Sequence, residues 1–122
     1  MAKVMIVDDS ETQRFPLKQE FQNAGYQVVE ANDGLTGLST LKENPDVALI
    51  ICDVNMPGMD GISMCAKIHE MEIFRGIPIF MLTTEASAEL KQKAKQFGVR
   101  AWITKPFDAK KMIEAAAKVV KK

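Results

Sequence analysis

The chain has 122 residues, 47% hydrophobic and 26% charged, a mixture typical of one globular domain and not of a disordered or membrane-spanning chain. Its 16 basic and 16 acidic residues cancel, so net charge gives no reason to expect nucleic-acid binding. No apolar stretch approaches the roughly 20 residues of a membrane span and no leader peptide is visible, so we expect a cytoplasmic protein that does not bind membranes.

Five apolar runs alternate with five segments that carry apolar residues at helical spacing. The predicted strands are residues 4–7, 26–31, 47–52, 77–82 and 100–104, and continuous apolar runs of this length are typical of strands covered on both faces. The intervening helical positions are Leu17, Phe21 and Ala24; Leu35, Leu38 and Leu41; Ile62, Cys65 and Ile68; Leu90, Ala94 and Phe97; and Met112, Ala116 and Val119. This alternation predicts a single doubly wound α/β domain over residues 1–122.

Turn and cap residues support these boundaries, with one conflict in the first helix. Gly25 stands where that helix would end, and Asp33 and Asp108 stand where later helices would begin. If Ser10 caps the first helix, Pro16 lies about one and a half turns inside it and removes a backbone hydrogen bond. We therefore expect a kink or a late start of this helix.

Polar side chains follow four of the predicted strands, at the point where each apolar run ends. Asp8 and Asp9 follow the first strand and Asp53 follows the third. Thr83 follows the fourth strand and Lys105 the fifth. Ligands of open parallel sheets bind beyond the carboxyl ends of the strands, so these residues form one candidate site. Adjacent carboxylates repel each other and lose water there, which predicts a bound cation.

The donor set of this candidate site favours Mg²⁺. Carboxylate oxygens suit a hard cation, whereas zinc is disfavoured because His69 is the only histidine and the two cysteines lack ligand spacing. A cation would screen Asp53 from its acidic neighbours, so that this carboxylate can attack a phosphoryl group as the nucleophile. Lys105 and Thr83 would then stabilise charge on the transferred oxygens.

Four segments carry a resemblance that spans the whole chain. They are "VDDS" at 7–10, "DVNMPGMDG" at 53–61, "LTTE" at 82–85 and "KPF" at 105–107. In order and spacing they resemble a response-regulator receiver domain of the CheY-like single-domain type. The resemblance implies a flavodoxin-like or CheY-like (βα)5 fold with a five-stranded parallel sheet in the order 2-1-3-4-5. It also implies a phosphorylation-activated role in two-component signal transduction, with a sensor histidine kinase as phosphodonor.

The same resemblance implies a metal and acceptor site. Asp53 matches the phosphoacceptor, and Asp8, Asp9 and Asp53 match the Mg²⁺ ligands. Asn55 would complete the metal shell through its backbone carbonyl. Beyond its own phosphorylation and dephosphorylation, the protein would not be an enzyme.

Further matches concern switching. Thr83 resembles the family's switch hydroxyl, Lys105 its invariant lysine, and Pro106 its cis proline. Trp102 stands where the family usually has Tyr, Phe or His, so it is either a mobile switch or a static half-buried aromatic. Glu85 stands two residues past the switch threonine.

Asn55 and Glu85 together form a pair found in chemotaxis regulators, which favours a monomeric chemotaxis regulator with a CheA-like kinase. Its downstream target would bind the face made of the fourth helix, fifth strand and fifth helix. That face would include Lys91, Lys95, Arg100, Trp102 and Lys111.

Three other functions compete with this interpretation. A single-domain phosphate sink or relay outside chemotaxis would share every motif. A haloacid-dehalogenase-type phosphatase also joins an aspartate nucleophile to Mg²⁺, but its D-x-D motif should close the first strand, where Asp8 and Asp9 are adjacent. A flavodoxin-like FMN carrier needs a phosphate loop after that strand, where "DDSETQRFP" would repel phosphate without a metal.

Overall fold

Strands and helices alternate along residues 2–120, the part of the chain that the computed structural model describes. The elements are β1 (Lys3–Val7), α1 (Glu11–Asn23), β2 (Gln27–Ala31), α2 (Gly34–Glu43), β3 (Val47–Cys52), α3 (Gly61–Glu70), β4 (Ile79–Thr83), α4 (Ala88–Lys95), β5 (Val99–Thr104) and α5 (Ala109–Val119). All the predicted strands and helices are confirmed. Across these residues, none of the helices combines the length and apolar character that crossing a membrane requires.

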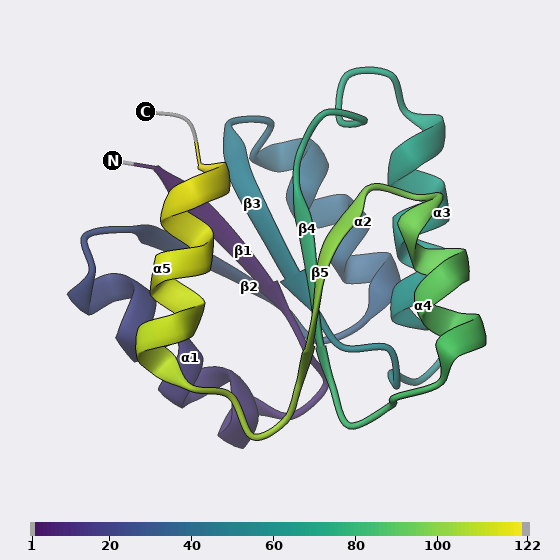
Figure 1. The fold of residues 1–122 in the computed structure, drawn as a ribbon. Coiled ribbons are helices and arrows are strands. Elements are labelled where there is room, and N and C mark those ends of the chain that lie inside the picture. The colour runs from purple at the N-terminus through teal and green to yellow at the C-terminus, as the bar shows by residue number, and fades with distance from the viewer. Residues whose placement is uncertain (1, 121–122) are drawn as a thin grey trace.

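The five strands form one parallel sheet in the order β2-β1-β3-β4-β5. Helices α1 and α5 cover one face, and α2, α3 and α4 cover the other (Figure 1). The order reverses between β1 and β3, where open parallel sheets bind their ligands. The doubly wound (βα)5 fold and the predicted strand order are therefore confirmed.

Each face of the sheet has its own apolar core. Along β1, Val4 and Ile6 pack with α1 and α5, whereas Met5 and Val7 pack with the helices of the opposite face. Because both faces of the central strands are covered, each position faces a core, and the sequence of such a strand is a continuous stretch of apolar residues.

Helix α1 begins where the cap predicts, in spite of its internal proline. It starts at Glu11, and the Ser10 hydroxyl accepts a hydrogen bond from the backbone N–H three residues further on, at 3.2 Å. The helix then runs through Pro16 to Asn23, so the expected late start is wrong. The cap and the burial of two side chains beyond the proline, Leu17 and Phe21, offset the lost hydrogen bond.

Helix α2 packs through two glycines in addition to Leu41. Gly34, Gly37 and Leu41 are buried, whereas Leu35 is 62% exposed. A Cβ atom at Gly37 would lie 2.8 Å from the Met64 sulfur, so the glycine lets α2 approach α3 closely without displacing this methionine side chain. This approach turns the Leu35 position toward solvent.

An ion-pair cluster joins α1 to the edge strand β2. The two carboxylate oxygens of Glu30 accept hydrogen bonds from Arg14 Nε at 3.1 Å and from Lys18 Nζ at 3.0 Å. Burial alone would raise the pKa of Glu30, but the hydrogen bonds from Lys18 and Arg14 outweigh it and lower the pKa below its ordinary value of 4.5.

This lowered pKa predicts a pH-dependent loss of stability in Glu30→Gln. A carboxyl whose pKa falls on folding contributes stability above its unfolded pKa, and that stability is lost as the pH falls through the folded value. We expect Glu30→Gln to lower the free energy of unfolding by about 1 kcal/mol at pH 7. This deficit relative to wild type should become smaller below pH 4.5. Urea denaturation at both pH values measures it, with the exposed Glu43→Gln as control. A difference that grows on acidification would contradict the assignment.

Candidate functional site

The loops after β1, β3, β4 and β5 meet at one edge of the sheet, the lower edge in Figure 1. Asp8 is 7% exposed and Asp53 is 8% exposed, although both carry carboxylates, and Thr83 is fully buried. Lys105 comes to the same place at the end of β5. Asp9 is exposed. Four of the five predicted strand-end residues therefore line one buried polar site, with Asp9 at its margin.

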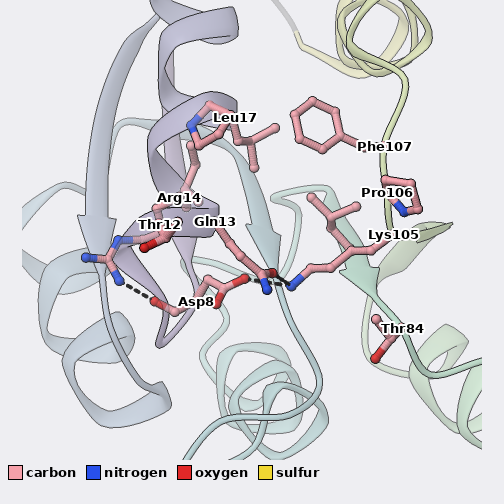
Figure 2. A pocket seen from close by; sticks show the side chains of 12 residues that line it. Asp8, Thr12, Gln13, Arg14, Leu17, Thr84, Lys105, Pro106 and Phe107 are labelled. Carbon is pink, nitrogen blue, oxygen red and sulfur yellow. Dashed lines mark hydrogen bonds and ion pairs between the residues drawn. The ribbon is translucent and has the colours of Figure 1, made fainter.

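Lys105 bridges the two buried carboxylates. Its Nζ lies 2.7 Å from Asp53 Oδ2 and 3.0 Å from Asp8 Oδ2, and it also donates a hydrogen bond to Gln13 Oε1 (Figure 2 draws the Asp8 and Gln13 contacts). Burial alone would lower the pKa of Lys105, but hydrogen bonds to Asp53 and Asp8 outweigh it and raise the pKa. The ammonium is therefore charged at neutral pH and holds both carboxylates around one point.

Backbone N–H groups fix the other oxygen of each carboxylate. Asp8 Oδ1 accepts from the Ser10 N–H at 2.9 Å, and Asp53 Oδ1 accepts from the Asn55 N–H at 3.1 Å. Arg14 Nη1 also donates to the Asp8 backbone carbonyl (Figure 2). These bonds set the orientation of both carboxylates before any ligand binds.

The oxygen donors of this site fit Mg²⁺ in their chemistry. Asp8 and Asp53 offer carboxylate oxygens at one place, which is the ligand type this cation prefers. Within residues 2–120, no three acidic, histidine or cysteine side chains are gathered as a ready-made metal site, and the third predicted carboxylate ligand, Asp9, is exposed. A complete set of predicted ligands requires the Asp9 carboxylate to come together with those of Asp8 and Asp53.

Glu85 makes hydrogen bonds with three residues from different parts of the chain: Asn55, Thr83 and Trp102. Its carboxylate accepts from Asn55 Nδ2 at 3.2 Å, and its backbone N–H donates to Thr83 Oγ1 at 3.3 Å. Its backbone carbonyl accepts from Trp102 Nε1 at 2.8 Å. The half-buried Trp102 ring also packs against the core. A movement of the β4–α4 loop at Glu85 must therefore disturb all three partners.

Tight backbone packing positions Asp53. The Gly61 N–H, at the start of α3, donates to the Val54 carbonyl at 2.9 Å, and a Cβ atom at Gly61 would lie only 2.0 Å from the Asp53 carbonyl oxygen. On the other side of the site, the Lys105 N–H donates to the Thr83 carbonyl at 2.9 Å. The Lys105–Pro106 peptide is cis, as expected.

Gln13 and Arg14 belong to the site but were not singled out from the sequence as site residues. Both lie in the first turns of α1, directly after the acidic loop, and each contacts Lys105 or Asp8. The start of a helix that follows β1 always faces the ligand-binding edge in this fold, so chain position was the available signal.

The two cysteines lie in the core and outside the site. Cys52 and Cys65 are free and buried. Hydrogen bonding with Cys65 and burial raise the pKa of the Cys52 thiol, which keeps it neutral and unreactive.

Comparison with known proteins agrees with the fold and the motifs. The family model described as the response regulator receiver domain matches residues 4–117. The chain is 39% identical to chemotaxis protein CheY-3 of Vibrio cholerae over 118 residues, which cover 96% of this chain and 90% of that protein.

Two solved structures extend the comparison. Vibrio cholerae chemotaxis protein CheY4 is 38% identical with a TM-score of 0.91, and the match covers 98% of this chain and 99% of that one. A chain of the CheX-CheY-BeF3-Mg²⁺ complex of Borrelia burgdorferi is 28% identical with a TM-score of 0.89, covering 98% of this chain and 90% of that one. The chain therefore belongs to the response regulator receiver domain family and has chemotaxis CheY proteins among its relatives.

Proposed function

We propose that this protein is a phosphorylation-activated switch whose residues 1–122 form one receiver domain. Asp53 accepts a phosphoryl group from a sensor histidine kinase of the CheA type, in a reaction that requires Mg²⁺. The observation that carries the proposal is the Lys105 ammonium, which lies 2.7 Å from Asp53 and 3.0 Å from Asp8. An ammonium in contact with a nucleophilic carboxylate is placed to stabilise the oxygens of an incoming phosphoryl group.

The metal ligands in this proposal are the carboxylates of Asp8, Asp9 and Asp53 and the backbone carbonyl of Asn55. When bound, Mg²⁺ supplies the positive charge that offsets these carboxylates and the phosphoryl oxygens. The two hydrogen bonds from backbone N–H groups hold Asp8 and Asp53 in place. Lys105 then orients the phosphoryl group, and Asp53 attacks phosphorus in line with the departing group.

The output is carried from Thr83 to the protein surface. Thr83 Oγ1 exchanges its hydrogen bond with the Glu85 N–H for one with a phosphoryl oxygen, and the Glu85 loop and Trp102 move with it. The partner binds the surface formed by α4, β5 and α5, where Lys95, Arg100 and Lys111 are exposed.

Chemotaxis is the proposed pathway because the compared relatives are chemotaxis proteins that match most of the chain. The protein acts as a monomeric signalling switch. Its only chemistry is its own phosphorylation and dephosphorylation.

A fluorescence experiment tests the switching step. Beryllofluoride with Mg²⁺ mimics the phosphoryl group, and Trp102 is the only tryptophan, so its emission reports on this position alone. We expect a change in emission in wild type, because activation disturbs the hydrogen bond from Trp102 Nε1 to the Glu85 carbonyl. The change should vanish in Asp53→Asn and be much smaller in Thr83→Ala.

Equilibrium dialysis of beryllium provides the control for binding. If beryllofluoride binds wild type without any change in emission, Trp102 is a static aromatic and the proposed output route is wrong. An undiminished change in Thr83→Ala would remove that threonine from the route.

A further inference from the structure

The side chain of Arg14 joins the acidic loop, residues 8–10, to the edge strand β2. Its Nη1 donates a hydrogen bond to the Asp8 backbone carbonyl (Figure 2), and its Nε donates to Glu30 Oε1 at 3.1 Å. The Arg14 side chain is only 13% exposed, although it carries a charge. A guanidinium suits this position because its planar set of donors can contact a carbonyl and a carboxylate at the same time.

The contact with the Asp8 carbonyl bears on the position of Asp9. This carbonyl and the Asp9 N–H belong to one planar peptide unit, so a bond that fixes the carbonyl also fixes the peptide that leads into Asp9. On the other side, the Ser10 N–H donates to Asp8 Oδ1 at 2.9 Å, and the Ser10 carbonyl accepts from the Arg14 N–H at 3.0 Å. Both neighbours of Asp9 are therefore held, which leaves its side chain as the part of the loop that rearranges when a cation binds.

The end of β2 also holds this loop directly. The Ala31 carbonyl accepts from the Asp8 N–H at 3.1 Å. The neighbouring Glu30 carboxylate binds Arg14 with one oxygen and Lys18 Nζ, at 3.0 Å, with the other. Strand β2 therefore contacts the Asp8 N–H directly and the Asp8 carbonyl through Arg14.

We propose that Arg14, by bridging the acidic loop and Glu30, is a positioning residue for the Mg²⁺ site. The inference rests on the proposed function, in which Asp8 and Asp9 are metal ligands, and adds a residue that acts on the metal only through them. A loop that is already held in place loses less conformational freedom when it binds a cation, so holding it raises the affinity. Residues that orient metal ligands through hydrogen bonds commonly change metal affinity by about tenfold or more.

The positive charge of Arg14 acts in the opposite direction. A guanidinium near a cation site repels the cation, so removing its charge alone would make Mg²⁺ bind more tightly. Lys18 carries the same charge and binds the same carboxylate, but within residues 2–120 its side chain makes no hydrogen bond to the acidic loop. A loss of affinity on replacing Arg14, and not on replacing Lys18, would therefore report the hydrogen bond to Asp8.

Calorimetric titration with Mg²⁺ alone tests the inference on Arg14→Gln and its matched control Lys18→Gln. Each variant loses one positive charge and one hydrogen bond to Glu30. We expect the dissociation constant for Mg²⁺ to rise about tenfold in Arg14→Gln and to stay within about twofold of wild type in Lys18→Gln. Equal dissociation constants in the two variants, or wild-type affinity in Arg14→Gln, would overturn the inference.

Arg14→Lys separates the geometry from the charge, and it decides the matter if Arg14→Gln does not fold. Lysine keeps the charge but ends in a single nitrogen, whereas two nitrogens of arginine contact Asp8 and Glu30. We expect a dissociation constant about tenfold above that of wild type in this variant too. Wild-type affinity in Arg14→Lys would overturn the inference, because the bridge between the loop and β2 would then not be needed.

The wild-type titration distinguishes failure of this inference from failure of the proposed function. Wild type that binds no Mg²⁺ at millimolar concentration would refute the proposed function, and this inference with it. Binding by wild type without any loss in the two Arg14 variants would refute the inference alone.

Discussion

Lys105→Met is expected to lower the free energy of unfolding of the metal-free protein by about 3 kcal/mol. The variant leaves Asp8 and Asp53, both nearly buried, without the ammonium that contacts them at 3.0 and 2.7 Å. Removing one member of a buried charged group is costly because the remaining charges are desolvated and unpaired. Urea denaturation in the presence of a chelator measures the loss.

The matched control is Lys3→Met. The Lys3 ammonium lies 3.0 Å from Asp46, which is largely exposed. Removing this ion pair should therefore lower the free energy of unfolding by less than about 1 kcal/mol. Millimolar Mg²⁺ should reduce the deficit of Lys105→Met, because a bound cation replaces part of the missing charge. Equal losses for the two variants, or a deficit that Mg²⁺ leaves unchanged, would contradict this electrostatic account.

Gly61→Ala is expected to destabilise the protein by about 3 kcal/mol and to disturb the acceptor site. An added Cβ would lie 2.0 Å from the Asp53 carbonyl oxygen and 2.9 Å from its carbonyl carbon. These are backbone atoms, so relief requires α3 or the Asp53 backbone to shift. Thermal denaturation measures the stability, and the rate of phosphorylation measures the displacement of Asp53.

Gly76→Ala controls for the general effect of replacing glycine. An added Cβ there meets nothing within 4 Å. We therefore expect the free energy of unfolding to change by no more than about 1 kcal/mol and the rate of phosphorylation to stay the same. If Gly61→Ala were as stable as Gly76→Ala, the claim that close packing of α3 against the Asp53 backbone excludes a side chain at residue 61 would be wrong.

The fold was predictable from the sequence because strands that are buried on both faces appear as continuous apolar stretches. The run at 47–52 became β3 at the predicted residues, since a central strand has no exposed position for a polar side chain. Helix starts were predictable for a local reason. Asp33 and Asp108 both accept hydrogen bonds from backbone N–H groups three residues further on.

Features that the sequence pattern did not predict depend on packing between elements. The leucine spacing of α2 predicts a helix but not which leucines are buried: Leu35 is exposed, and Gly37 lies on the covered side. Pro16 suggested a kink or a late start of α1; the late start is wrong because the cap before the proline and the core contacts beyond it hold the helix together. Hydrophobic periodicity and helix propensity describe one segment at a time, so they contain no information on contacts between segments.

The charged residues at the strand ends of the candidate site were predictable, but their contacts were not. Parallel strands bring their carboxyl ends to one edge, which places Asp8, Asp53 and Lys105 together from topology alone. The exposure of Asp9 and the contact of Gln13 with Lys105 depend on how side chains are arranged in the folded protein. Sequence spacing contains no information on either.

The intact mass of the protein after incubation with phosphoramidate tests the central claim most directly. With Mg²⁺ present, wild type should gain the mass of one phosphoryl group, and Asp53→Asn should gain none. Wild type in a chelator should also remain unmodified, because the carboxylates that surround Asp53 would repel the donor. Modification of Asp53→Asn to the same extent as wild type, or of wild type equally well without a divalent cation, would contradict the account.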